Sequence, residues 1–257
     1  MSVRLGPRDA WALLWLSQMG AAPMDVFADL LACWPLRKPR PGMAAETGGS
    51  EINAYRVARR FRAAGKVVVD DFGNLPRPVP GPSWVVPTHV VASELLDFTV
   101  QKWVPGPMMA KHLATVARVR LALADGDIAD EWVSERVLRH RGGFVTRAGE
   151  QLPHVHDGHW TDKAGDLHAI EVELTRKGSA DARATMQAAY DAARDAGAVS
   201  LRYYCESAEV RSRVAAAARD LTKSPGGPEV TSRDLTKLLH PDTGHGRGLS
   251  VVGGTAS

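Results

Sequence analysis

His154–Lys177 reads H-V-H-D-G-H-W-T-D-K-A-G-D-L-H-A-I-E-V-E-L-T-R-K. Its second part, residues 169–175, has the alternating pattern of a strand, in which successive side chains face opposite sides of a sheet. The side chains that face the core in this interpretation are Ile170, Val172 and Leu174. The opposite face then carries Glu171, Glu173, Thr175 and Lys177. Glu171 and Glu173 are unusual on an otherwise apolar strand, and they indicate a function for this face.

Residues 161–166, between the two parts of this stretch, are rich in turn-forming residues. They predict a hairpin that brings Asp157 alongside Glu171. Carboxylates that converge repel one another, and a bound divalent cation or a raised pKa relieves the repulsion. Oxygen ligands suit Mg²⁺ or Mn²⁺, so Asp157 and Glu171 are the predicted metal ligands. A nearby lysine, Lys177, would orient an attacking water or contact a phosphate.

Asp157, followed fourteen positions later by Glu171-Val172-Glu173, resembles the signature of the PD-(D/E)xK nuclease superfamily. The resemblance implies phosphodiester hydrolysis with Asp157, Glu171, Glu173 and Lys177 as the catalytic residues. His156 stands where that signature has a proline, and Glu173 where it has a lysine. The resemblance therefore bears more on the fold than on the activity.

Two other interpretations of the same stretch stay open. In the first, it is a hairpin whose acidic face simply meets water, as is ordinary for a half-buried strand. In the second, His154, His156 and Asp157 bind zinc, although no cysteine lies close by in the sequence. The histidines would also suit the surroundings of a cation site.

The chain of 257 residues has the composition of an ordinary globular protein, and its length suits one large domain or two small ones. Cys33 and Cys205 are too few for a disulfide framework, which favours a reducing compartment. No basic segment followed by an apolar run opens the chain, and no apolar run approaches the ~20 residues of a membrane span. We expect a cytoplasmic protein with no membrane partner.

The positive charge of the chain is concentrated in its first part. Residues 1–80 hold 11 Lys and Arg against 7 Asp and Glu, whereas the remaining 177 residues hold 21 against 22. Such an excess indicates nucleic acid if it is arranged on one face. Whether the basic residues share one face depends on the predicted helices of this part.

Three helices are predicted in this basic part. The first begins at Pro7 and ends at Gly20, the second begins at Pro23, and the third is capped by Ser50 and ends near Ala64. On the third helix, one face is apolar and carries Ala54, Val57, Ala58, Phe61 and Ala64. The opposite face carries Tyr55, Arg56, Arg59, Arg60 and Arg62.

Residues 67–69, a turn at 71–74 and a proline-rich return to residues 84–86 follow the third helix. Three helices followed by a hairpin resemble a winged helix-turn-helix domain. That resemblance implies double-stranded DNA as partner, with the third helix in the major groove and its arginines on phosphates or guanine edges. The other interpretation is a surface helix whose arginines are merely solvated. Winged-helix proteins often bind DNA as a homodimer, but the sequence contains no obvious dimer seam.

The remainder is predicted as a core of helices and strands, and Val90–Trp103 as a linker helix before it. The predicted elements are a helix at Met108–Ala124, a strand at Glu131–Arg139, the two strands of the hairpin, a helix at Ser179–Asp195, a strand at Ala198–Cys205 and a helix at Val210–Leu221. Glu135 would supply a further acid, and His112 is interpreted as a packed or exposed histidine rather than a ligand. After Ser224 we expect a flexible tail, apart from a short helix near Leu235–Leu239.

This order of elements resembles the restriction-endonuclease-like core, a mixed sheet flanked by helices. The predicted fold class is therefore α/β (α+β), divided into a winged-helix domain at 1–87, a linker at 88–107, a nuclease-like domain at 108–223 and a tail at 224–257. The whole pattern resembles the replication-relaxation family of bacterial plasmids and other mobile elements, over residues 8–221. That resemblance implies a role in the replication, transfer or control of such an element.

Three hypotheses follow. The first is a DNA-binding protein with a nuclease-like domain whose activity the sequence leaves open, and the second is an active endonuclease that depends on Mg²⁺ or Mn²⁺. The third is a protein-interaction module without nucleic-acid contact. The altered lysine position argues against cleavage, while the acids argue for a bound metal.

Overall fold

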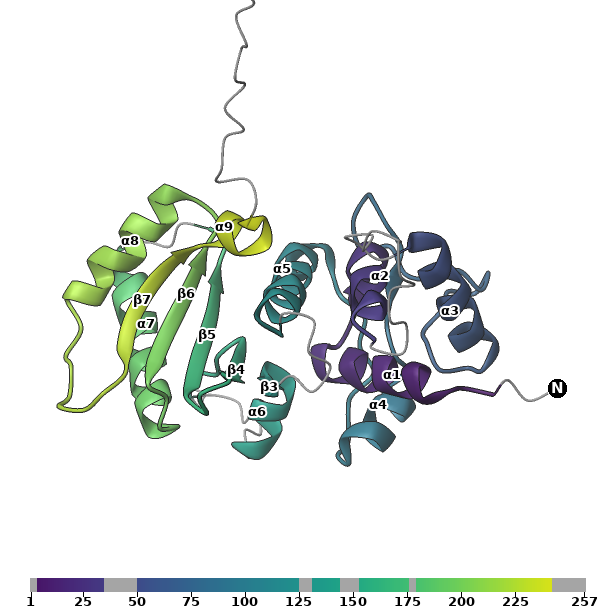
Figure 1. Ribbon diagram of the computed structural model, residues 1–257, viewed down its shortest axis with the longest axis horizontal. Coiled ribbons are helices and arrows are strands. Elements are labelled where there is room, and N and C mark those ends of the chain that lie inside the picture. Colours follow the sequence, from purple (N-terminus) through teal and green to yellow (C-terminus); the bar gives the residue numbers. More distant parts are fainter. Residues whose placement is uncertain (1–3, 35–49, 125–130, 144–152, 176–178, 242–257) are drawn as a thin grey trace, which may run out of the picture.

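The computed structural model describes residues 4–34, 50–124, 131–143, 153–175 and 179–241 (Figure 1). Within these ranges the chain is a mixed α/β protein with nine helices, a five-stranded mixed sheet and a small two-stranded sheet. Lys177 lies outside the described residues. None of the helices in the described part of the chain has the length and apolar character that a membrane crossing requires.

The N-terminal half holds the three predicted helices and a small sheet. Its elements are α1 (Pro7–Met19), β1 (Ala22–Pro23), α2 (Met24–Ala32), α3 (Glu51–Ala63), β2 (Trp84–Val85) and α4 (His89–Leu96). Pro7 begins α1, and Gly20 ends it with a φ of 87°, which favours glycine. The Ser50 hydroxyl accepts a hydrogen bond from the Asn53 amide at 3.4 Å and caps α3 as predicted.

The chain after α3 returns as an antiparallel hairpin. Val67 bridges Pro87, and the Val68 amide donates to the Val86 carbonyl at 2.8 Å. The returning strand β2 also pairs antiparallel with β1. Residues 69–83 therefore form a loop that projects from this small sheet and that we call the 69–83 loop.

The C-terminal half is built around the five-stranded sheet. Its elements are α5 (Pro107–Ala124), β3 (Glu131–Ser134), α6 (Glu135–Arg141), β4 (Gly158–Thr161), β5 (Leu167–Glu173), α7 (Ser179–Asp195), β6 (Ser200–Cys205), α8 (Ala208–Arg219), β7 (Glu229–Asp234) and α9 (Leu235–Leu239). The strands lie in the order β3-β4-β5-β6-β7. The first three are antiparallel, and β5, β6 and β7 are parallel.

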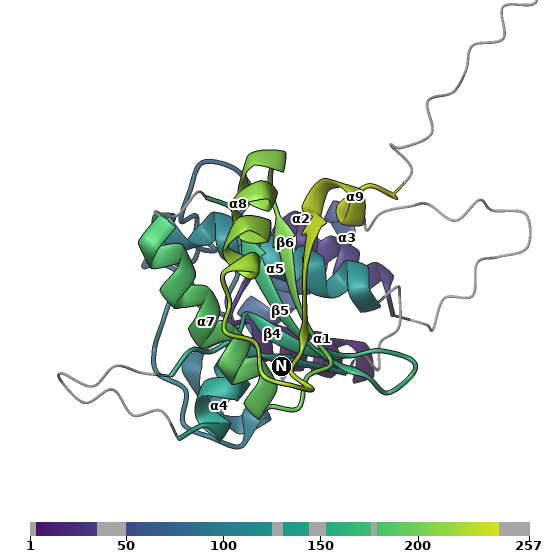
Figure 2. The same ribbon diagram turned by 90° about the vertical axis from the view of Figure 1, so that its left-hand side faces the viewer.

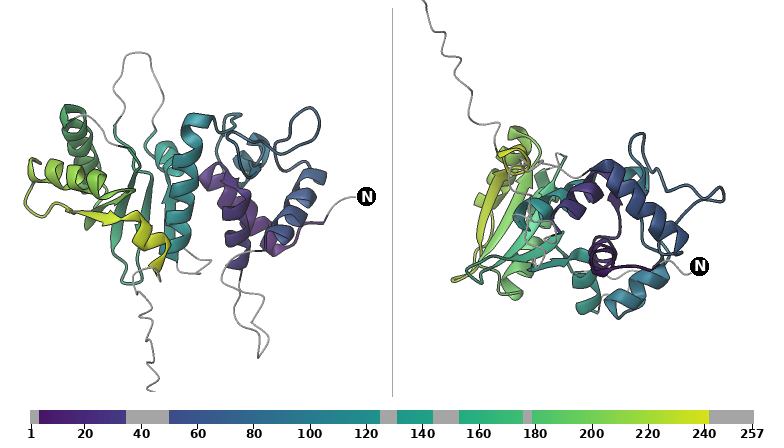
Figure 3. Two further views of the ribbon diagram at one scale, coloured as in Figure 1. Left: turned by 90° about the horizontal axis from the view of Figure 1, so that it is seen from above. Right: turned by 45° about the vertical axis from the view of Figure 1, so that its right-hand side comes forward.

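The helices cover both faces of this sheet. Helices α7 and α8 lie next to each other on the face turned away from the N-terminal half (Figures 1 and 2). Helix α5 lies on the other face, between the sheet and the N-terminal helices, so that the molecule is layered when seen from above (Figure 3). The order of elements agrees with the prediction for most of this half.

The parity predicted for β5 is confirmed. Ile170 and Val172 are buried in the core that faces α5, and Glu171 and Glu173 are partly buried on the other side. The predicted hairpin is also present: the Gly165 amide donates to the Asp162 carbonyl at 2.9 Å, and Gly165 has a φ of 87°. This turn sets the register of the hairpin, in which Gly158 pairs with Ile170 and Thr161 with Leu167.

The predicted strand at Glu131–Arg139 was wrong in its second part. The strand ends at Ser134, and residues 135–141 form α6. The partner strand β4 pairs only with residues 131–134, which leaves no ladder for a longer β3. In addition, the Arg139 guanidinium donates to Glu135 at 2.8 and 2.6 Å, an i,i+4 pair that favours a helix.

Two further expectations differ from the structure. The helix expected at Val90–Trp103 is the shorter α4, which Thr88 caps and which packs against α1; Asp97, with a φ of 57°, follows its last residue. The tail expected to be flexible from residue 224 instead contributes β7 to the sheet, because its backbone pairs with β6 along six residues. The short helix expected near Leu235–Leu239 is confirmed as α9.

The main apolar core runs through both halves. It joins Phe27 and Phe61 of the N-terminal helices to Ile170 of the sheet by way of Val116 and Val119 on α5. A second core lies between the sheet and the pair α7 and α8. Helix α5 therefore belongs to both halves of the molecule, and the boundaries at 87 and 107 stay predictions.

Candidate functional site

Asp157 lies at the start of β4 and is held by two hydrogen bonds. Its Oδ2 accepts from the Val172 amide of β5 at 2.7 Å, and its Oδ1 lies 2.8 Å from Nε2 of His112. β4 begins at Gly158, which pairs with Ile170, so Asp157 immediately precedes the paired residues. The Asp157 side chain, rather than its backbone, accepts the hydrogen bond from the Val172 amide. The structure thus brings Asp157 alongside the strand that carries Glu171, as predicted.

His112 was not predicted as part of this site. It comes from α5, and its hydrogen bond to Asp157 raises its pKa above the ordinary value, against the lowering effect of burial. Its helical phase is shared with Val116 and Val119, one and two turns later, which pack into the core beneath the sheet. That phase is the signal in the sequence that places His112 against the sheet.

His154 and Glu171 form a second histidine–carboxylate pair. Nε2 of His154 lies 2.7 Å from Oε1 of Glu171, and the two side chains are only 17% and 14% exposed. Glu171 projects from the middle of the sheet, while His154 precedes β4. The carboxylate and the imidazole are thus held together away from bulk water.

His156 is buried beside this pair. Its Nε2 lies 3.0 Å from the Ala189 carbonyl of α7, which only accepts, so Nε2 carries the proton. Its Nδ1 lies 3.1 Å from Nε2 of His159 and then accepts from that ring. Burial lowers the pKa of His156 to about 3. Burial also lowers the pKa of His159.

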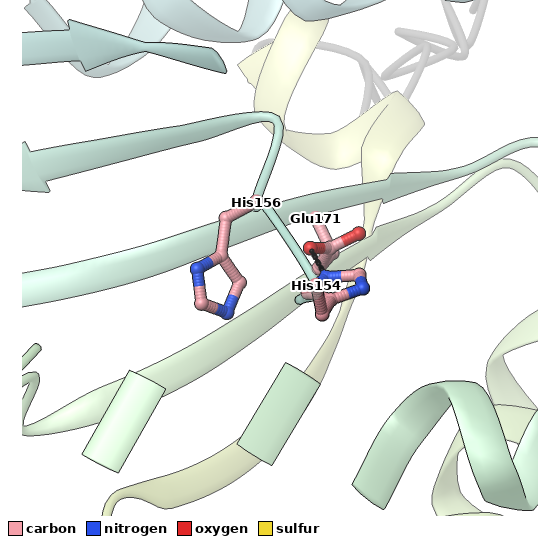
Figure 4. Close-up of side chains that lie close together, drawn as sticks. All are labelled: His154, His156 and Glu171. Atoms are coloured by element: carbon pink, nitrogen blue, oxygen red, sulfur yellow. Dashed lines mark hydrogen bonds and ion pairs between the residues drawn. The ribbon is translucent and has the colours of Figure 1, made fainter. Parts of the chain in front are cut away.

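Three of these side chains gather into one cluster, which we call the His-Glu cluster: His154, His156 and Glu171 (Figure 4). One potential ligand atom from each lies within 4.8 Å of the other two. The predicted metal ligand Asp157 does not belong to this group. Histidine nitrogens thus replace the second carboxylate that the sequence suggested.

Glu173 lies on the same face of β5 as Glu171. Both line a small hollow between the sheet and the helices α7 and α8, together with Tyr203. Burial raises the pKa of the Tyr203 hydroxyl well above its ordinary value, and Glu171 and Glu173 add to the effect. The role predicted for Lys177 falls on a residue outside the described ranges.

The predicted basic face of α3 is largely exposed. Tyr55, Arg56, Arg59 and Arg62 are exposed, while Ala54, Val57 and Phe61 are buried. α3 lies at the outer side of the N-terminal half, on the side away from the sheet (Figures 1 and 3). The Arg62 guanidinium donates to the Gly73 carbonyl at 2.8 Å and ties α3 to the 69–83 loop.

Arg60 differs from the other arginines of α3. Its Nη2 donates to both carboxylate oxygens of Asp9, at 2.8 and 3.0 Å. The Asp9 side chain is only 6% exposed, and this partly buried ion pair links α3 to α1. Its position on the helix is the one predicted, but its guanidinium is engaged within the protein.

A cleft of about 670 Å³ lies between α3 and the 69–83 loop. The lining includes the aromatic ring of Tyr55 and three guanidinium groups, those of Arg59, Arg62 and Arg77. Asp70 also borders it, and hydrogen bonds from the amides of Asn74 and Phe72 lower the pKa of this carboxylate. The cleft is open to solvent and mainly basic.

No protein family model, no curated protein and no solved structure matches this chain.

Proposed function

We propose that this protein binds double-stranded DNA through α3 and the 69–83 loop, and that it serves the replication, transfer or control of a plasmid or another mobile element. The observation that carries the DNA-binding part is the exposed basic face of α3, on the outer side of the molecule. Guanidinium groups spaced along an exposed helix suit phosphates and the guanine edges of a major groove.

The arrangement of the surrounding elements supports this use of α3. Three helices are followed by a hairpin whose returning strand pairs with β1, an arrangement similar to a winged helix-turn-helix. The hydrogen bond from Arg62 to Gly73 fixes the 69–83 loop beside α3. Asp70 stabilises the turn within this loop, because its Oδ1 accepts hydrogen bonds from the amides of Phe72 and Asn74 at 2.9 and 2.7 Å.

The C-terminal half supports the assignment to mobile elements. The order from α5 onwards, with three antiparallel strands and a fourth strand parallel to the third, resembles a restriction-endonuclease-like core. A winged helix joined to such a core is the pattern of the replication-relaxation family. The two cysteines, Cys33 and Cys205, favour a reducing compartment, and we propose the cytoplasm. Whether the protein binds DNA as a homodimer stays open.

DNA binding is tested by the dependence of affinity on salt. The experiment measures the anisotropy of a labelled mixed-sequence duplex, in chelator and at several KCl concentrations, for wild type and for Arg56→Gln/Arg59→Gln. Each lost phosphate contact lowers the slope of log K against log salt by about 0.9, so the double variant should lose roughly 1.8. The control is Arg219→Gln, which removes one positive charge from the exposed end of α8 and should leave the slope unchanged.

Equal slopes for the double variant and wild type would remove α3 from the interface. If the wild-type protein does not bind the duplex even at low salt, the protein is instead an interaction module without nucleic-acid contact.

A second function, Mg²⁺- or Mn²⁺-dependent cleavage of DNA, is favoured by the position of Asp157 beside the strand that bears Glu171. We rank it below DNA binding because both oxygens of Asp157 already have partners, in His112 and in Val172. Plasmid nicking in Mg²⁺ or Mn²⁺ that disappears in both Asp157→Ala and Glu171→Ala, with DNA binding preserved, would reverse this ranking.

A further inference from the structure

We propose that the His-Glu cluster binds a transition-metal ion of the Zn²⁺ class, in preference to Mg²⁺. The site consists of His154, His156 and Glu171. It is independent of the proposed DNA contacts, because those lie on α3 at the other end of the molecule (Figures 1 and 4).

The donor atoms decide the class of ion. Two imidazoles and one carboxylate form a mixed nitrogen and oxygen set, which suits Zn²⁺ and its neighbours, whereas Mg²⁺ prefers oxygen ligands in a near-ideal octahedron. Three protein ligands also match the number found in zinc sites that keep one position for water. The pair His112–Asp157 stays outside the set, because it does not belong to the group of ligand atoms that lie within 4.8 Å of one another. The Val172 amide also holds the second oxygen of Asp157.

The geometry requires only small movements of side chains. Nε2 of His154 and Oε1 of Glu171 are already 2.7 Å apart, and a cation would replace the proton between them. Ligands of tetrahedral zinc lie about 2.0–2.2 Å from the ion, and therefore about 3.4 Å from one another. The atoms of the cluster lie within 4.8 Å of one another, so rotation about side-chain bonds closes the remaining gap.

His156 changes partners when the ion binds. Its two ring nitrogens contact the Ala189 carbonyl and His159, and one of these hydrogen bonds gives way to the ion. The bond that remains orients the ring, as hydrogen bonds from the second nitrogen do in other histidine metal sites. His154 precedes β4 and Glu171 sits on β5, so the hairpin holds the other two ligands.

The test is metal binding by the full chain, freed of any histidine tag and stripped with chelator. Zn²⁺ is titrated in competition with a chromophoric chelator, and Co²⁺ is titrated while its visible absorption is recorded. We expect one ion per chain and Co²⁺ bands of a low-coordinate nitrogen and oxygen site. His154→Ala and Glu171→Gln should weaken Zn²⁺ binding by at least about tenfold, since even outer partners of a metal typically contribute that much.

Two controls make the result specific. His89→Ala removes a histidine from the exposed start of α4 and should leave affinity unchanged. Asp157→Asn removes the carboxylate outside the set and should also retain Zn²⁺ binding. Circular dichroism confirms that each variant is folded before titration, and Glu171→Gln keeps the shape of the native side chain.

Absence of Zn²⁺ and Co²⁺ binding to the folded wild type would overturn the proposal. So would loss of binding in Asp157→Asn together with effective competition by Mg²⁺, because that result assigns the ion to Asp157 and Glu171. DNA affinity of the same preparations, measured in chelator, reports the proposed DNA function separately.

Discussion

Arg59 and Arg60 are neighbours on α3, and the structure gives them different roles that one pair of substitutions separates. The Arg60 guanidinium is bound to the nearly buried Asp9, whereas Arg59 is exposed and borders the cleft beside the 69–83 loop. Replacing each by methionine keeps an unbranched apolar stem and removes the charge and the donors. Arg60→Met should therefore reduce stability, and Arg59→Met should reduce DNA affinity.

The size of the stability loss follows from the exposure of the pair. Hydrogen bonds to charged groups are worth about 1.5–3 kcal/mol, and breaking a fully buried pair costs about 3–5 kcal/mol. Asp9 is 6% exposed but Arg60 is 39% exposed, so water reaches one partner and the lower range applies. Arg8, 3.6 Å from Asp9, offers a weaker second cation. We expect a loss of about 2 kcal/mol for Arg60→Met and less than about 0.5 kcal/mol for Arg59→Met.

Urea unfolding, followed by circular dichroism, gives the stability of both variants, and duplex anisotropy at several salt concentrations gives the slopes. Arg59→Met should lower the slope by about 0.9 and Arg60→Met should leave it unchanged. Adding Asp9→Asn to Arg60→Met should recover part of the lost stability, because the unpaired buried charge is then gone. The reasoning is refuted if Arg60→Met is as stable as wild type, or if it lowers the slope as much as Arg59→Met does.

Three further predictions test other parts of the structure. Gly158→Ala would place a Cβ 2.1 Å from the Trp132 ring, so it should cost about 1–3 kcal/mol in urea unfolding, and adding Trp132→Leu should relieve part of that loss. The pKa of His112 is raised in the folded state, so its contribution to stability is complete below pH about 6.5 and is lost as pH rises through the folded-state pKa. The free energy of unfolding should therefore differ more between wild type and His112→Gln at pH 6 than at pH 8, with wild type the more stable. Leu235→Ala in α9, at a residue 6% exposed, should cost about 2–4 kcal/mol, while Lys237→Ala on the exposed side should change stability by less than about 0.5 kcal/mol; equal effects would contradict the packing of α9.

Local rules were sufficient for the elements whose pattern and end signals agree. Alternation along β5 predicted which side chains face the core, and the turn residues at 161–166 predicted the hairpin. Ser50 marked the start of α3, the helix ends near Ala64 as predicted, and its apolar spacing predicted the buried face. In these places the backbone, the pattern and the turn chemistry point to one structure.

The misplaced elements depend on partners that are distant in the sequence. Residues 229–234 read E-V-T-S-R-D, which is mostly polar, and they become a strand because β6 offers an edge for parallel pairing. β3 ends at Ser134, the last residue that pairs with β4, and α6 begins at the next residue. Neither limit is visible in the local pattern, since propensity for strands depends on neighbours.

The hairpin beside the candidate site was predicted, but the partners of its side chains were not. Asp157 and Glu171 lie where the hairpin suggested, yet His112 approaches from α5 and the Ala189 carbonyl from α7. These contacts span 45 and 33 residues of sequence. Only the folded sheet, with helices on both faces, brings them to the same strand, and this is why the sequence favoured Asp157 as a ligand over His156.

Helix α5 determines how the two proposals have to be tested. Val116 and Val119 complete a core that also contains Phe27 and Phe61, so the N-terminal helices do not bury their apolar faces without α5. The same helix supplies His112 to Asp157 and pairs Arg118 with Asp25 of α2 at 2.5 Å. A fragment that ends at residue 107 would expose this core to water, and an unfolded fragment would lose DNA binding for a reason unrelated to Arg56 or Arg59. Substitutions in the full chain leave α5 in place, and they can therefore separate the DNA contacts of α3 from the metal ligands of the sheet.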